Sequence, residues 1–150
     1  SMGKKRAIAN DGVTNNQRYE LFKSLFSHLN QCIEKGFYIE AIALEESFIA
    51  DRLESRINLL QPINEFSFKP LEKLISKIKE IESDEEIKSF VISEITNWKN
   101  GRNYAVHELA KIQINENTTW NDRLKRCKES ANSGKEILRT LDKLIQNTKK

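Results

Sequence analysis

Hydrophobic residues recur every three or four positions along most of the chain, a spacing that places them on one face of an α-helix. The pattern predicts helices over 17–35, 37–60, 70–81, 84–113 and 119–147. Gly36 alone separates the first two, so they are expected to form an antiparallel hairpin. No segment alternates hydrophobic and polar residues as a strand does. The predicted fold is all-α, an antiparallel bundle of about five helices that opens with a long helical hairpin.

The fourth helical segment is predicted to be broken near Asn100-Gly101. Asn-Gly is a turn-forming pair and a common helix stop. Asn103 can then cap a new helix, because its side chain can accept from the first free backbone N–H groups. In an unbroken α-helix, Arg102 and His107 would point about 140° apart, since each residue turns the chain by about 100°. The expected break would free Arg102 to fold back towards His107.

Length and composition bound the organisation of the chain. Its 150 residues are enough for a single domain with a hydrophobic core. Residues 1–15 are mostly polar and show no helical periodicity. We therefore expect a flexible N-terminal arm over 1–15 and one helical domain over 16–150. Ser1, which precedes Met2, is interpreted as a remnant of tag removal.

Apolar runs, cysteines and charge exclude several classes of protein. No run of about 18 apolar residues is present, so no membrane span is expected, and the first residues lack the pattern of a secretion signal. Cys32 and Cys127 fall on apolar helix faces, which favours buried free thiols in a cytoplasmic protein. With two Cys and two His, no metal site or other cofactor is predicted. The net charge of +3 does not indicate a strong non-specific nucleic-acid binder.

Arg102, Asn103 and His107 are the candidate catalytic residues. Arginine holds phosphate oxygens through parallel N–H donors and keeps its charge, and histidine moves protons near neutral pH. A cation that holds the phosphate and a group that transfers protons are the two main requirements for cleaving RNA without a metal ion. Asn103 can bind a phosphate oxygen or the histidine, or it can serve only as the helix cap. A surface histidine without a catalytic role is the alternative interpretation of His107.

Glu45 and Glu46 stand out in the second predicted helix. Stepping 100° per residue places Glu46 in the middle of the apolar stripe, with Glu45 at its side. A carboxylate on an apolar face is costly unless it is paired, so we expect Glu46 to be buried and to contact an arginine. The pair can be purely structural, or one of the two glutamates can orient Arg102 or His107.

The helical layout and the Arg-Asn-x-x-x-His motif together resemble the HEPN superfamily. Its hallmark is an arginine, usually followed by a polar residue such as asparagine, with a histidine four to six positions after the arginine. Arg102, Asn103 and His107 fit that hallmark, whereas the rest of the chain resembles the superfamily only in its helical layout. In one toxin group the histidine is followed by x-Tyr. Here Glu108-Leu109 follows, so control through that tyrosine is not expected.

The resemblance implies a metal-independent endoribonuclease, usually a homodimer that sets two motifs against one cleft. The 2′-hydroxyl of RNA would attack the adjacent phosphate, His107 would transfer a proton, and Arg102 would stabilise the developing charge. The resemblance also implies a setting in phage defence, a toxin–antitoxin pair or RNA processing, with an antitoxin or regulatory protein among the partners. Some members of the superfamily are inactive, so a helical dimerisation or partner-binding module is the alternative.

Overall fold

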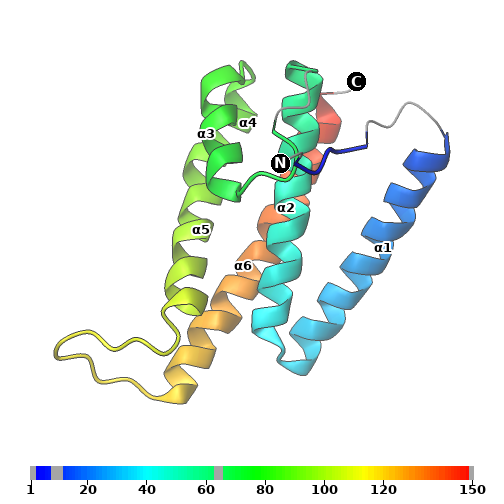
Figure 1. The fold of residues 1–150 in the computed structure, drawn as a ribbon. Helices are drawn as coiled ribbons and strands as arrows, with labels where there is room; N and C mark the ends of the chain where they lie inside the picture. Colours follow the sequence, from blue (N-terminus) through cyan, green and yellow to red (C-terminus); the bar gives the residue numbers. More distant parts are fainter. Residues whose placement is uncertain (1–2, 8–11, 63–65, 149–150) are drawn as a thin grey trace.

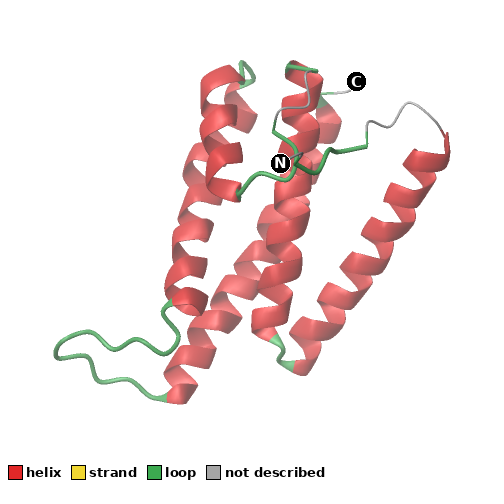
Figure 2. Cartoon of the chain, viewed as in Figure 1, coloured by secondary structure: helices red, strands yellow, loops and turns green. Residues whose placement is uncertain are grey.

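The computed structural model describes residues 3–7, 12–62 and 66–148, which form five helices and no strand (Figures 1 and 2). The prediction of an all-α bundle of about five helices is confirmed. The elements are α1 (Gly12–Lys35), α2 (Tyr38–Leu60), α3 (Leu71–Ile81), α4 (Glu85–Phe90), a first π-helical turn (Val91–Ile95), α5 (Thr96–Arg102), a second π-helical turn (Asn103–His107) and α6 (Trp120–Asn147). The segment from α4 to the second π-turn is one continuous helix.

The opening hairpin forms as predicted, and Gly36 makes the turn. Gly36 has a φ of 81°, a left-handed conformation that glycine adopts without strain. Its N–H donates to the carbonyl of Ile33 at 3.2 Å, and the N–H of Phe37 donates to that of Cys32 at 2.8 Å. These two bonds are a Schellman motif, which satisfies the last carbonyls of α1. α1 and α2 therefore run antiparallel, side by side (Figure 1).

The first helix begins earlier than the hydrophobic pattern predicts. α1 starts at Gly12, so residues 12–15 of the expected flexible arm are helical. No proline interrupts the chain between Gly12 and the predicted start at Gln17. Extending a formed helix adds one hydrogen bond for each residue fixed, so the helix continues past the apolar stripe. Residues 1–2 and 8–11 of the expected arm lie outside the described residues.

α2 is the central helix of the bundle. It packs most extensively against α6, and it also contacts α1 and α3 (Figure 1). α2 and α6 run in the same direction, while α1 and α5 run in the opposite one. The core residues that α2 and α6 contribute are Ala41, Ile42, Phe48, Ile49, Leu53, Ile57, Cys127, Ala131, Leu138, Leu141 and Ile145. Cys32 and Cys127 are buried free thiols, as predicted.

The predicted break at Asn100-Gly101 is wrong. Both residues lie inside α5, and the helix continues through them to His107. Neither residue adopts a positive φ, so the pair does not act as a left-handed stop. The packing of the buried Trp98 and Ala105 on either side of the pair favours continuing the helix, and tertiary contacts of this kind override local propensity. Asn103 consequently lies within the helix and does not cap a new one.

An ion pair between Arg56 and Glu82 fastens α2 to the turn that leads into the motif-bearing helix. Both side chains are buried, and Nε and Nη2 of Arg56 donate to the carboxylate of Glu82 at 2.6 and 3.0 Å. Glu82 also accepts from the backbone N–H groups of Ser83 and Asp84, just before α4. Asp84 then caps α4 by accepting from two backbone N–H groups. The start of the helix that carries the motif is therefore fixed in position.

Two helical glycines give a matched test of this packing. A Cβ at Gly101 would meet its nearest neighbour, Oγ of Ser130, at 4.0 Å. Because glycine is a poor helix former, Gly101→Ala should raise the free energy of unfolding by about 0.5–1 kcal/mol in urea denaturation. A broken helix with a left-handed Gly101 would instead make the variant less stable than the wild type.

Gly134 should respond in the opposite direction. A Cβ there would lie 2.8 Å from Nε1 of Trp98 and closer still to the carboxyl group of Glu45. Overpacking of this kind costs about 1–3 kcal/mol, so Gly134→Ala should lower the free energy of unfolding by that amount. Equal effects of the Gly101→Ala and Gly134→Ala substitutions would contradict the packing of α5 and α6 described here.

Candidate functional site

Arg102 is held in place at the end of α5 by contacts on two sides. Its Nη1 forms an ion pair with Glu46 of α2, and its Nη2 donates to Oδ1 of Asn103 at 2.8 Å. Nε of Arg102 has no hydrogen-bond partner among the described residues. The side chain keeps only 11% of its surface exposed. The guanidinium is therefore fixed by an α2 carboxylate and by the neighbouring amide.

The second π-turn places His107 one turn beyond Arg102. A π-helix bonds residue i to residue i+5, so residues five apart diverge less than the about 140° that separates them in an α-helix. Single π-turns inside α-helices occur frequently at functional sites. His107 is exposed and forms no hydrogen bond or ion pair with any described residue. The motif thus combines a fixed arginine with a histidine that is free to contact a ligand.

Asn103 orients the arginine. It is half-buried, and its side-chain oxygen accepts from Arg102. The structure therefore joins Arg102, Asn103 and Glu46 in one set of contacts. His107 lies on the same π-turn, but no bond links it to that set within the described part of the chain.

The expected burial of Glu46 is wrong, while its expected pairing with an arginine is found. The Glu46 side chain is 35% exposed, and its ion pair with Arg102 joins α2 to the end of α5. Its neighbour Glu45 is the fully buried carboxyl group. Ile42, Ile49, Leu53 and Ile57 of the apolar stripe are buried as the pattern indicates, and the buried face of α2 extends further to the side of Glu45, which lies against Gly134 of α6.

Glu45 faces the core, and the structure does not bring it to Arg102 or His107. Neither of its carboxyl oxygens has a hydrogen-bond partner among the described residues. The carboxyl group and the indole of Trp98 both lie beside Gly134, and the indole N–H donates to the carbonyl of Ser130 at 2.9 Å. Loss of hydration raises the pKa of Glu45 from its ordinary value of 4.5 to about 9, against a smaller lowering by the charge of Lys135.

Arg123 organises the loop that follows His107, and sequence reasoning missed it. Its Nη1 donates to the carbonyl of Glu108 at 3.1 Å, and its Nη2 donates to the carbonyl of Lys111 and the carboxylate of Glu116, both at 2.7 Å. Arg123 is buried at the start of α6. Its position, four residues before the buried Cys127, was the available signal, because a charged residue on a buried stripe requires partners.

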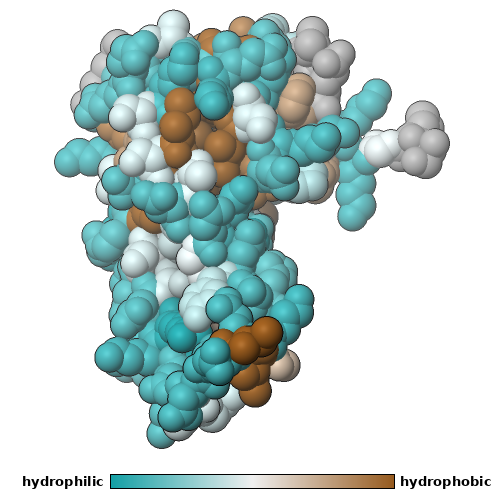
Figure 3. Space-filling view, turned by 90° about the vertical axis from the view of Figure 1, so that its left-hand side faces the viewer, coloured by the Kyte–Doolittle hydropathy of each residue, from teal (hydrophilic) through white to brown (hydrophobic). Residues whose placement is uncertain are grey.

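The loop between the motif and α6 carries exposed hydrophobic side chains. Ile112 is 72% exposed and Ile114 is 93% exposed. The loop extends from the end of the bundle in Figure 1, and Figure 3 shows a hydrophobic patch at that end. The motif therefore lies beside an apolar surface that no described part of this chain covers.

The described residues contain neither a metal-binding cluster nor a membrane-spanning helix. No group of three or more His, Cys, Asp or Glu side chains in residues 3–7, 12–62 and 66–148 is arranged to hold a metal ion. Over the same ranges, no helix combines the length and hydrophobicity needed to cross a bilayer.

Comparison with known proteins gives no match to a protein-family model, to a curated protein or to a solved structure.

The buried carboxyl group of Glu45 should make stability depend on pH. Its folded-state pKa of about 9 lies above its ordinary value of 4.5, so the folded protein holds this proton more tightly than the unfolded chain does. The protonated carboxyl group makes its full contribution to the free energy of unfolding below about pH 4.5. This contribution is lost as the pH rises towards 9, and the free energy of unfolding then falls by at most about 1.4 kcal/mol per pH unit. Urea denaturation should show stability falling over this window.

Glu45→Gln removes the titrating group and keeps its shape, so the variant should lose most of this slope and be more stable than the wild type at pH 9. Glu40→Gln, an exposed site on the same helix, should keep the wild-type slope. Parallel pH profiles for the wild type and Glu45→Gln would show that the carboxyl group is hydrated in the folded protein.

Proposed function

We propose that this protein is a metal-independent endoribonuclease of the HEPN type. The observation that carries the proposal is the single π-turn that joins a positioned arginine, Arg102, to a free and exposed histidine, His107. The proposed family rests on the Arg-Asn-x-x-x-His motif together with the all-α bundle and its opening hairpin. The proposed setting is phage defence, a toxin–antitoxin pair or RNA processing.

The proposed reaction uses the nucleophile of the substrate. The 2′-oxygen forms a bond to the adjacent phosphorus, and the bond from phosphorus to the 5′-oxygen breaks, which leaves a cyclic phosphate. His107 takes the proton of the 2′-hydroxyl or supplies one to the 5′-oxygen. A guanidinium has five N–H donors, and the contacts to Glu46 and Asn103 leave others for a phosphate oxygen. Arg102 would stabilise the extra negative charge of the transition state.

A second copy of the chain would complete this reaction. A single histidine does not readily act as base and acid in one step, and each chain has one histidine in the motif. A two-fold axis near the second π-turn would bring two His107 side chains to one phosphate, and two-fold dimers are the commonest oligomers. Ile112 and Ile114, exposed in the adjoining loop, offer apolar area for such an interface.

A catalytically inactive dimerisation or partner-binding module is the second candidate. The observation that favours it is the burial of Arg102, whose charge is already balanced by Glu46. An ion pair of this kind also serves to join two helices. In that case Arg102 would have a structural role, and His107 would be an ordinary surface residue.

Cleavage of RNA in the presence of a chelator separates the two candidates. We expect the wild-type protein to cut single-stranded RNA in EDTA, to leave cyclic phosphate ends, and to spare DNA of the same sequence, which lacks the 2′-hydroxyl. His107→Ala should lower the rate by at least about 100-fold, as expected for loss of a general acid or base. Gel analysis of end-labelled oligonucleotides measures both results.

The matched control is His28→Ala, because His28 is the other histidine of the chain and is exposed on α1, outside the motif. It should cut at the wild-type rate. Intact RNA after incubation with the wild-type protein, or equal rates for the wild type and His107→Ala, would exclude the ribonuclease and favour the partner-binding module.

A further inference from the structure

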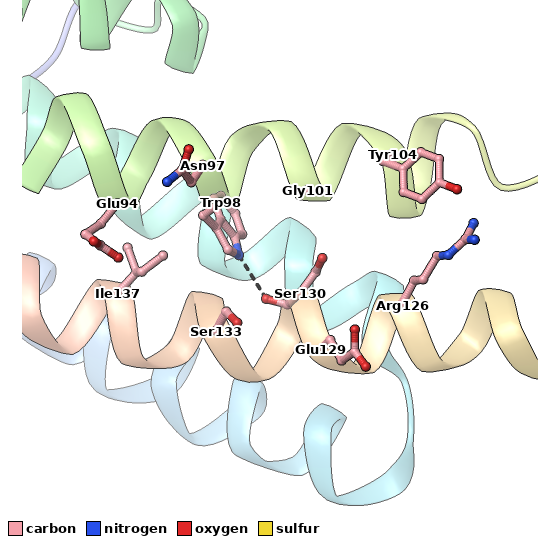
Figure 4. A pocket seen from close by; sticks show the side chains of 10 residues that line it. All are labelled: Glu94, Asn97, Trp98, Gly101, Tyr104, Arg126, Glu129, Ser130, Ser133 and Ile137. Carbon is pink, nitrogen blue, oxygen red and sulfur yellow. Dashed lines mark hydrogen bonds between the residues drawn. The ribbon is translucent and has the colours of Figure 1, made fainter.

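A groove runs between α5 and α6 and holds side chains that the proposed reaction does not use. Its volume is about 510 Å³, within the range of about 300–1,000 Å³ that is usual for small-ligand sites. Figure 4 shows the groove with Tyr104 and Arg126 at one end and Glu94 and Ile137 at the other. Tyr104 belongs to the same π-turn as His107, so this groove begins at the motif.

The guanidinium of Arg126 lies over the ring of Tyr104 at the motif end of the groove. The guanidinium carbon of Arg126 lies 4.4 Å from the centre of the Tyr104 ring. Arg126 is also held from the loop side, where Nη1 lies 3.9 Å from the carboxylate of Glu116. Unpaired bases of RNA stack on aromatic rings and on arginine planes, and a nearby guanidinium attracts the phosphate. This end of the groove therefore suits a nucleobase with its phosphate.

The wall beside the stack presents hydrogen-bond acceptors. Glu129 lies one turn of α6 beyond Arg126, is exposed, and lines the groove with the hydroxyl of Ser130. Among the described residues Glu129 forms no ion pair, so its carboxylate is open to a ligand. A carboxylate accepts through two oxygens and donates nothing when ionised. Of the four RNA bases, guanine alone presents two neighbouring donors, N1–H and N2–H, to such a pair of oxygens.

We propose that the groove between α5 and α6 binds an unpaired guanine of single-stranded RNA next to the cleavage site. The base extends the stack of Tyr104 and Arg126, and its N1–H and N2–H donate to Glu129. The inference deepens the proposed ribonuclease function and rests on it, because it names the base that the same site would select. Glu129 is then the specificity-determining residue and Tyr104 a base-stacking residue, and both are separate from the proposed catalytic group His107.

Binding of an uncleavable ligand tests this inference separately from catalysis. The probes are four fluorescein-labelled 2′-O-methyl RNA hexamers that differ only in one central base, guanine, adenine, cytosine or uracil. Fluorescence anisotropy should show the guanine hexamer binding about 5- to 100-fold more tightly, as expected for one bidentate base contact. Tyr104→Ala should weaken all four hexamers by a similar factor through loss of stacking.

Glu129→Gln should abolish the preference for guanine and leave the affinity for the other hexamers within about twofold. Glu94→Gln is the matched control, because it makes the same change at the far end of the groove and should keep the preference. Equal binding of the four hexamers by the wild type, or a guanine preference that survives Glu129→Gln, would overturn the inference. If either result is found in a protein that still cleaves RNA, the proposed ribonuclease function stands. If the protein binds guanine selectively but cleaves no RNA, only the ribonuclease function is excluded.

Discussion

The ion pair between Arg102 and Glu46 is the contact on which the position of the candidate site depends. The motif lies at the far end of a long helix whose start is fixed near Glu82 and whose middle packs through Trp98, and this far end has an attachment of its own. Glu46 supplies that attachment from α2, the central helix of the bundle. The same contact fixes the guanidinium before any ligand arrives, and such preorganisation is a large source of electrostatic stabilisation in catalysis.

The π-turn at Asn103–His107 determines how His107 is oriented relative to the fixed Arg102, the two residues of the proposed reaction. An α-helical turn would direct Arg102 and His107 about 140° apart, whereas the wider turn reduces that divergence. Arg123 then holds the chain immediately after His107 by bonding to the carbonyl of Glu108. Arg102 is therefore fixed before His107, and Arg123 fixes the backbone after it. The imidazole of His107 itself stays free to contact a substrate.

The hydrophobic pattern was sufficient to predict the class of fold and most of the helices, because a period of about 3.6 residues is a local property of the sequence. The continuity of the helix at Asn100-Gly101 was not predictable in this way, since it depends on the burial of Trp98 and Ala105 against distant segments. The candidate residues Arg102, Asn103 and His107 were selected by type and spacing, and the pairing of Glu46 with an arginine was predicted from its place on the apolar stripe. Glu45 and not Glu46 is the buried carboxyl group because α6 packs against the Glu45 side of the apolar stripe, a tertiary contact that the helical period alone does not reveal.

The central claim is that Glu46 holds Arg102, and a double-mutant cycle on the free energy of unfolding tests it most directly. Arg102→Ala, Glu46→Ala and the double variant are compared with the wild type by urea denaturation. A partly exposed pair should show a coupling energy of about 1–2 kcal/mol, between the values typical of surface and buried pairs. Single effects that add to within about 0.5 kcal/mol would show that the two side chains do not interact and would contradict this account.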